Sequence, residues 1–228
     1  MQQETETETS MAPYHVRRYQ DHDWEPVREL FSKGMLGNIP SEFWTSLKKP
    51  RTFLVLLGVP FALFLGSGSL ILCLLSLFGL LACQWLTLRR FVKQYVENSL
   101  NTDLLDIQKS YVGFWVAECK HQVVGIVGAH PPLRPVGGGN YLELLHLSVK
   151  RNYRGKGLAR TLVQTLLHFA QDQGCDGVVL ETSNSNHPAR RLYESLGFQK
   201  AHESGYHLNW WLGYFSTWHY KCDFSSQK

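Results

Sequence analysis

The longest apolar stretch of the chain runs from Phe53 to Leu88, 36 residues without a single Asp, Glu, Lys, Arg or His. About 18 such residues already predict a membrane segment, and a buried core helix rarely runs this long without a polar face. As one continuous helix the stretch would be about 54 Å long, well beyond the ~30 Å of bilayer hydrocarbon. Pro60 and the Gly-Ser-Gly-Ser run at 66–69 offer natural breaks. We therefore expect a membrane segment that spans once or twice.

Basic residues flank this stretch on both sides. They are Lys48, Lys49 and Arg51 before it, and Arg89, Arg90 and Lys93 after it. Basic flanks are retained on the cytosolic side of a membrane, so both ends are expected on the same side, which favours a helical hairpin. Each arm would hold roughly 17 residues, near the lower limit for spanning. The side that carries the rest of the chain stays open, because a lumenal acceptor would demand the reverse orientation.

Outside this stretch, strand and helix periodicities alternate. Strand patterns cover 14–19, 114–119, 122–130, 141–149, 177–183 and 217–224, and helical patterns cover 21–35, 91–109, 158–173 and 188–196. Residues 38–50 read as a short helix or a loop. The order predicts a mixed α/β domain. We divide the chain into a disordered N-terminal extension (1–11), a first part of the domain (12–52), the membrane segment (53–88) and the main part of the domain (89–228).

Composition and charge narrow the function classes. The net charge of +4 is too small to argue for a nucleic-acid partner. The five cysteines are odd in number and show no CxxC spacing, which predicts neither a disulfide framework nor a zinc site. The first ten residues are polar and acidic, unlike a cleavable signal. Organised sequence begins after Met11, which is a second candidate start.

The stretch NYRGKGLA, residues 152–159, joins the strand pattern at 141–149 to the helical pattern at 158–173. A Gly-rich turn of this kind points the free N–H groups of a helix N-terminus outward, where they and the helix dipole favour an anion. Glycine is needed where backbone closely approaches a phosphate. Neither GxGxxG nor GxxxxGK[ST] is present here. The alternative is an ordinary basic turn.

Two motifs give this turn a context. Arg154-Gly155-Lys156-Gly157-Leu158-Ala159 matches the R/Q-x-x-G-x-G/A signature of the GCN5-related N-acetyltransferases. NHPARRLYESLGF, residues 186–198, resembles the second signature of that family, N-x-x-A-x-x-L-Y-x-x-x-G-F. The resemblance covers 14–50 and 91–224, so the membrane segment interrupts the domain. MAPYHVRRYQ at 11–20 and HLSV at 146–149 resemble the camello-like branch, typified by N-acetyltransferase 8.

The resemblance implies a fold and a cofactor site. The fold is a mixed, mostly antiparallel sheet with flanking helices, and acetyl-CoA is the co-substrate, with no metal. The acetyl-CoA arm is expected between the strands at 141–149 and 177–183, paired with backbone near Leu147 and Val149. The Val149 N–H, or a neighbour, is a reasonable oxyanion donor. The amides of Arg154, Gly155, Lys156, Gly157, Leu158 and Ala159 are expected to hold the pyrophosphate, and Asn186 to cap a helix and touch the cofactor.

The resemblance also suggests catalytic residues for direct attack of an amine on the thioester. Glu143, eleven residues before Arg154, stands where histone-acetylating members carry a catalytic glutamate, and Glu181 is its rival. Either one is otherwise a solvated carboxylate at a strand end. Tyr193 matches the tyrosine that protonates the leaving thiolate, and is otherwise a packed tyrosine. His146 alternates away from Glu143 and reads as a buried, hydrogen-bonded histidine, with a proton relay as the alternative.

By resemblance, the chain is a membrane-bound N-acetyltransferase of the endoplasmic reticulum. Its expected partners are the membrane and an amine acceptor, either the α-amine of cysteine S-conjugates or lysines of secretory-pathway proteins. A third interpretation is a catalytically weak acyl-CoA-binding membrane module. The oligomeric state stays open. The aromatic residues Trp210, Trp211, Tyr214 and Phe215 would wall the acceptor site, meet the membrane interface or belong to strand packing.

Overall fold

The computed structural model describes residues 14–132, 138–209 and 213–224, with backbone alone at 206–209 and 213–215. Its centre is a seven-stranded sheet in the order β1-β2-β3-β4-β5-β7-β6. Among the strand pairs in the described residues, β4 and β5 alone are parallel, and the other five pairs are antiparallel. The strands are β1 (His15–Arg18), β2 (Gly113–Cys119), β3 (Gln122–His130), β4 (Tyr141–Val149), β5 (Gly177–Ser183), β6 (Gln199–Asn209) and β7 (Gly213–Asp223). The predicted mixed, mostly antiparallel sheet is confirmed.

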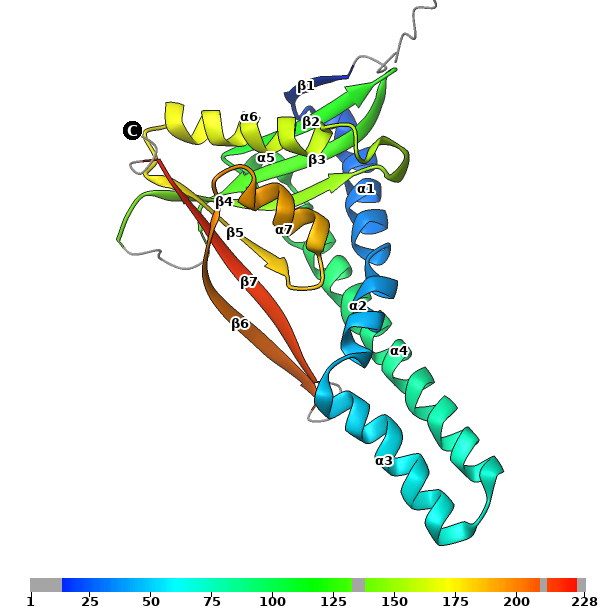
Figure 1. Ribbon diagram of the computed structural model, residues 1–228. Coiled ribbons are helices and arrows are strands. Elements are labelled where there is room, and N and C mark those ends of the chain that lie inside the picture. The colour runs from blue at the N-terminus through cyan, green and yellow to red at the C-terminus, as the bar shows by residue number, and fades with distance from the viewer. Residues whose placement is uncertain (1–13, 133–137, 210–212, 225–228) are drawn as a thin grey trace, which may run out of the picture.

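The helices cover both faces of this sheet. They are η1 (Asp21–Asp23), α1 (Trp24–Leu36), α2 (Ile39–Leu47), α3 (Pro50–Ser67), α4 (Leu70–Asn101), α5 (Ile107–Ser110), η2 (Arg151–Tyr153), α6 (Leu158–Asp172) and α7 (His187–Glu194). In Figure 1, α6 and α7 lie in front of the sheet, and α1 and α4 lie behind it. The apolar stripe of α6 packs into one core cluster with Val178 and Leu180 of β5. Val27 and Phe31 of α1 form a second cluster with Val92 of α4.

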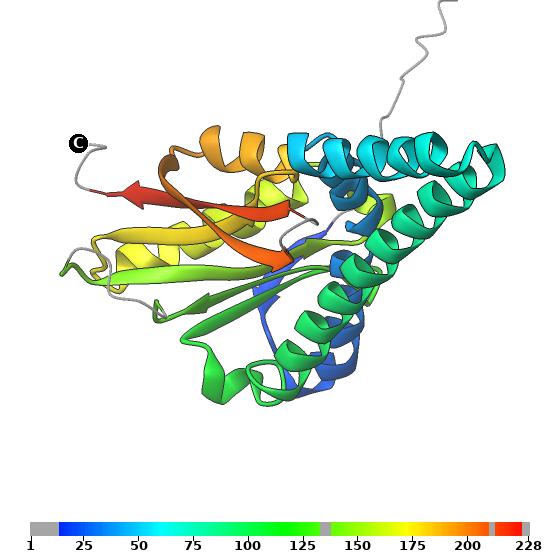
Figure 2. The same ribbon diagram turned by 90° about the horizontal axis from the view of Figure 1, so that it is seen from below.

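Helices α3 and α4 form an antiparallel pair that projects away from the sheet (Figure 1), and Figure 2 shows the same pair from below. The turn between them is at Gly68, whose φ of +63° is accessible to glycine at little cost. The other expected break is wrong, because Pro60 lies inside α3 and the helix continues past it. At 1.5 Å per residue, α3 is about 27 Å long and α4 about 48 Å.

The helix expected at 91–109 is confirmed over 91–101, but it is not separate from the apolar stretch. Residues 91–101 belong to α4, which runs unbroken from the apolar stretch into the core of the domain. No Gly or Pro occurs between Leu80 and Asn101, so nothing in the local sequence ends the helix at Leu88. The hydropathy of the sequence drops after Leu88, but the backbone stays helical. The structure therefore joins the apolar stretch to the domain through a continuous helix.

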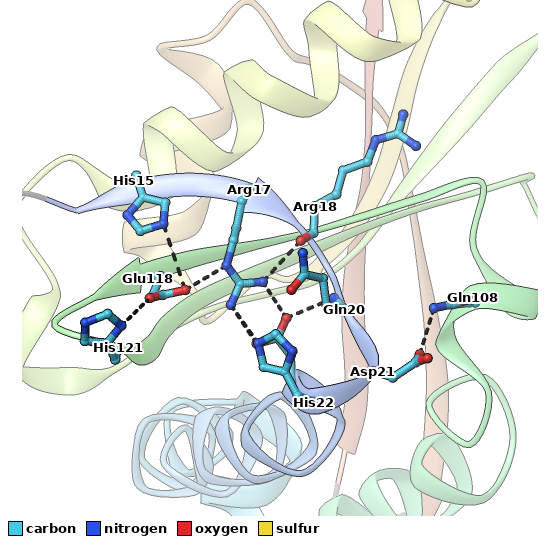
Figure 3. A network of polar contacts seen from close by, with 10 residues as sticks. His15, Arg17, Arg18, Gln20, Asp21, His22, Gln108, Glu118 and His121 are labelled. Atoms are coloured by element: carbon cyan, nitrogen blue, oxygen red, sulfur yellow. Dashed lines mark hydrogen bonds and ion pairs between the residues drawn. The ribbon is translucent and has the colours of Figure 1, made fainter.

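An ion network joins the N-terminal strand to the sheet (Figure 3). Arg17 on β1 donates to both carboxylate oxygens of Asp23, at 2.6 and 2.8 Å, and to Glu118 on β2 at 2.7 Å. Asp23 is 2% exposed, and burial opposes its ionisation. The hydrogen bonds from Arg17 and from the Gln20 N–H outweigh this effect, so the pKa of Asp23 is lowered.

Replacing Arg17 with methionine is expected to lower the free energy of unfolding by about 3 kcal/mol at pH 7, because it leaves a buried carboxylate unpaired. A lowered native pKa adds stability that is present above about pH 4 and is lost as the pH falls further. The difference between wild type and Arg17→Met should therefore shrink between pH 7 and pH 3, as measured by unfolding in detergent. Arg18→Met, on the exposed neighbouring residue, is the control. A difference that is constant with pH would contradict the ion-pair explanation.

Candidate active site

Strands β4 and β5 pair over only part of their length. Their register begins at Tyr141 opposite Gly177 and ends at Leu144 opposite Leu180. β5 continues to Ser183 with β7 as its partner, and β4 continues to Val149 with β3 as its partner. The two central strands therefore diverge after Leu144, and the expected splay between them is confirmed.

A bulge lies in β4 where the strands separate. Ile126 and Gly128 of β3, two residues apart, face Ser148 and Leu145, three residues apart. His146, inside the bulge, has a φ of +55°. Its ring contacts Phe31 of α1 edge-on at a centroid distance of 4.5 Å, and Leu145 packs against the same cluster. The expectation that His146 alternates away from Glu143 is wrong, because the extra residue shifts the alternation.

The bulge also decides which way the β4 backbone faces. Lys150 N–H donates to the Val124 carbonyl at 2.8 Å, and Val149 lies opposite Gly125. In an antiparallel ladder this pattern turns the N–H and C=O of Val149 away from β3, toward the side where β5 has diverged. The same alternation turns Leu147 that way, one residue before Ser148. The Val149 carbonyl accepts from Arg154 Nε at 2.9 Å. These backbone groups fit a ligand that carries amides, such as the pantetheine arm.

The turn after β4 has the geometry of an anion site. Gly155 and Gly157 have φ values of +76° and +83°, a region that favours glycine. Gly157 is the N-cap of α6 and has no side chain with which to bond the first amides of that helix. Because Leu158 is 2% exposed and its side chain packs in the core, its expected contribution is its backbone N–H. The donors present suit a phosphate.

Asn186 is the N-cap of α7, and Tyr193 lies within that helix. Asn186 caps α7, with its side-chain oxygen accepting from the Ala189 N–H at 3.4 Å, as expected. Tyr193 is 5% exposed and packs on Phe198 and Tyr220, at ring centroid distances of 5.7 and 6.2 Å. Burial raises the pKa of Tyr193 above its ordinary value. Within the described part of the chain, its hydroxyl makes no hydrogen bond to protein.

The two candidate bases differ in environment. Glu143 is 7% exposed and lies on β4 between His130 of β3 and Val179 of β5, one residue before the parallel pairing ends. The Glu181 side chain is 44% exposed, and its Oε1 lies 3.1 Å from Nδ1 of His219. Glu181 therefore has the environment of a solvated, paired carboxylate, and Glu143 that of a carboxylate enclosed at the splay.

Two polar residues near the site, Asp103 and Tyr111, have no signal in the sequence. His146 Nε2 lies 2.5 Å from Oδ2 of Asp103, and the Tyr111 hydroxyl donates to the same oxygen. Burial opposes ionisation of Asp103, but the hydrogen bonds from His146 and Tyr111 outweigh it and lower its pKa to about 2. His146 is thus a buried, hydrogen-bonded histidine, as expected. Asp103 lies 43 positions from His146, so no local pattern connects them.

Four aromatic residues were expected at the acceptor site, at the membrane interface or in strand packing. Trp210 and Trp211 lie outside the described residues, as do the side chains of Tyr214 and Phe215. Among the residues that are described, no cluster of His, Cys, Asp and Glu has the arrangement of a metal site.

Known proteins are similar to this chain in sequence. N-acetyltransferase 8F1 of Rattus norvegicus is 48% identical over 206 residues, which covers 89% of this chain and 93% of that protein. N-acetyltransferase 8B of Homo sapiens is 46% identical over 203 residues, covering 87% and 89%.

Two solved structures share the fold. One is an acetyltransferase of the GNAT family from Staphylococcus aureus Mu50, with a TM-score of 0.57, 15% identity and coverage of 92% of this chain and 99% of that one. The other is the PaiA N-acetyltransferase of Thermoplasma acidophilum in complex with coenzyme A, with a TM-score of 0.56, 14% identity and coverage of 93% and 99%. At these identities the likeness concerns the fold alone.

The family of the chain follows from these matches. The sequence model of the acetyltransferase (GNAT) family matches residues 80–198, which include the turn at Gly155–Gly157 and the Tyr193 helix. The relatives match nearly the whole chain, the apolar stretch included. The chain belongs to the N-acetyltransferase 8 branch of the GCN5-related acetyltransferase family and is an acetyl-CoA-dependent N-acetyltransferase.

Proposed function

We propose that this enzyme transfers acetyl from acetyl-CoA by direct attack of the α-amine of cysteine S-conjugates, at the surface of the endoplasmic reticulum membrane. The observation that carries the proposal is the opening between β4 and β5, with an anion-binding turn at its end and Glu143 at its start. An opening of this kind lets a thioester and an amine meet beside a buried carboxylate.

The chain's own residues suit the bound cofactor, whose thioester supplies an activated acetyl group. The backbone of Leu147 and Val149 is placed to pair with the amides of the pantetheine arm. The amides from Arg154 to Ala159 would hold the pyrophosphate. The Val149 N–H faces the opening and is the candidate donor to the developing oxyanion.

Two proton carriers complete the mechanism. Glu143 would accept the proton that the amine must lose, because it is the enclosed carboxylate beside the opening. Tyr193 would give a proton to the departing sulfur. A tyrosine hydroxyl is protonated at neutral pH, and burial raises the pKa of Tyr193 further above its ordinary value. Both residues favour catalysis over the alternative of a catalytically weak acyl-CoA-binding module.

Replacing Tyr193 with phenylalanine is expected to lower kcat by about tenfold to a hundredfold, since proton donation is lost while the ring still packs. The melting temperature should change little, because the hydroxyl makes no hydrogen bond within the described protein. Tyr220→Phe is a matched control on the neighbouring ring, whose hydroxyl instead donates to Glu194 at 2.7 Å. Full activity in Tyr193→Phe would leave this tyrosine with packing alone.

The membrane part of the proposal rests on the exposed surface of α3 and α4. Both helices have the length and composition to cross a bilayer. Large apolar side chains point outward along them, among them Phe53, Phe61, Leu65, Ile71 and Phe78, each more than half exposed. Exposing so large an apolar surface to water would be unfavourable. We propose that the pair inserts as a hairpin.

The hairpin is tested with single cysteines at Lys48 and Arg90, labelled by a membrane-impermeant reagent in sealed microsomes. Both flanks lie at the same end of the antiparallel pair, so both should react from the same side. A cysteine at Ser69, in the turn, should react only from the opposite side if both arms span. Flanks that react from opposite sides would contradict the hairpin.

The acceptor is tested with full-length enzyme in microsomes and acetyl-CoA, by offering S-benzyl-cysteine against a lysine peptide. Preferred acetylation of the cysteine conjugate supports the proposal. Preferred acetylation of the peptide supports the alternative of a lysine acetyltransferase. Binding of CoA without turnover of either acceptor would support the module.

A further inference from the structure

The bulge in β4 has a backbone conformation that its sequence does not favour. A residue with a Cβ seldom adopts φ values near +55°, although histidine tolerates them somewhat better than most residues. No glycine occurs in β4 to make the bulge easy. The bulge nevertheless lies where β4 leaves β5, and it sets the direction of the Leu147 and Val149 backbone. Its conformation must therefore be held by other contacts.

The side chain of His146 supplies those contacts. It is 5% exposed, and its Nε2 lies 2.5 Å from Asp103 Oδ2. The ring also meets Phe31 edge-on at 4.5 Å and Tyr111 at 6.0 Å. The Tyr111 hydroxyl donates to the same Asp103 oxygen. Asp103 is thereby fixed on one side by Tyr111 and holds His146 on the other.

We propose that Asp103 and His146 are positioning residues for the cofactor. Their contact keeps the β4 bulge in its left-handed conformation, so that the backbone of Leu147 and Val149 faces the opening where the acetyl-CoA arm binds. Neither residue needs to touch the cofactor for this role. The inference rests on the proposed cofactor site between β4 and β5, and it adds a part of the chain outside both family signatures.

The test uses full-length protein in detergent and measures CoA affinity by calorimetry, together with thermal unfolding. His146→Ala loses the contact and keeps the backbone penalty, so CoA affinity should fall by about tenfold. His146→Gly loses the same contact but adopts a positive φ freely, so it should recover most of that affinity. A role in packing alone predicts the reverse, because glycine removes more side chain and adds unfolded-state entropy.

Asp103→Ala should weaken CoA binding to the same extent as His146→Ala. The double variant should be no weaker than either single variant, since both changes remove the same contact. Glu97→Ala, which removes the exposed Lys93–Glu97 pair on α4, is the control and should bind CoA normally.

Three results would overturn the inference. The first is unchanged CoA affinity in His146→Ala and Asp103→Ala. The second is a His146→Gly variant that binds CoA no tighter than His146→Ala. The third is a double variant whose loss of CoA affinity is the sum of the two single losses. Wild-type protein that binds no CoA would instead overturn the proposed cofactor site, and the inference with it. If His146→Ala does not fold, Asp103→Ala and His146→Gly still decide the question.

Discussion

Replacing Glu143 with glutamine is expected to lower kcat by about a hundredfold, with KM for acetyl-CoA changed by less than about twofold. Glutamine keeps the shape and the hydrogen-bonding capacity of the side chain but cannot accept the proton of the amine. The carboxylate lies on β4 where pairing with β5 ends, away from the pyrophosphate turn. Steady-state kinetics with acetyl-CoA and acceptor varied separately would measure the two effects.

Glu181→Gln is the matched control for this experiment. Glu181 lies one residue beyond the last β4–β5 pair, but it is largely exposed and is paired with His219. Its replacement should leave kcat within about twofold. If kcat fell a hundredfold in Glu181→Gln and was unchanged in Glu143→Gln, Glu181 would be the base and Glu143 would not. If both variants kept full activity across pH, the amine would be deprotonated by something other than these carboxylates.

Replacing Gly157 with valine is expected to weaken CoA binding by at least about a hundredfold. A β-branched residue is strongly disfavoured at a φ of +83°, so the turn must change conformation. That change moves the first amides of α6, which are the expected pyrophosphate donors. Calorimetric titration of CoA into the full-length protein measures the loss directly.

Gly174→Val separates this effect from simple backbone strain. Gly174 follows the other end of α6 and has a φ of +69° with open space around it, so valine there meets a similar conformational penalty. Both variants should be destabilised by about 1–3 kcal/mol. Only the Gly157 variant should lose CoA affinity. Equal losses of affinity in the two variants would show that strain acts through the helix as a whole.

Much of this structure could be predicted because its signals are local. The turn at 152–159 is specified by glycines where positive φ is needed and by a strong strand before it. The cap at Asn186 and the two-residue turn at Lys120 and His121 are equally local. The bounds of strand β6 were not predicted, and the end of the apolar stretch was mistaken for the end of a helix. Helix continuity is decided by the absence of breakers, which hydropathy does not report.

The candidate site was predicted only as far as its residues lie near the two signatures. The bulge in β4 contains no glycine that would have predicted it. Regular strand alternation therefore placed His146 on the opposite face of the sheet from the one it occupies. Asp103 follows α4 and Tyr111 follows α5, and neither segment carries a motif. Tertiary folding brings both residues to this histidine. The residues that support a site are thus harder to predict than those that line it, since their partners are distant in sequence.

The unbroken course of α4 has a mechanical consequence. A helix of 32 residues that runs from the hairpin turn into the second core acts as a stiff lever, because its apolar and domain-facing parts share one hydrogen-bond ladder. If the hairpin inserts as proposed, the catalytic domain would be held at a set height and tilt above the surface from which the hairpin emerges, whereas a flexible linker would not fix its position. Asp103 lies two residues after the end of α4. Under the same proposal, bilayer thickness would be connected to the geometry of the acetyl-CoA opening through α4 and the residues that follow it.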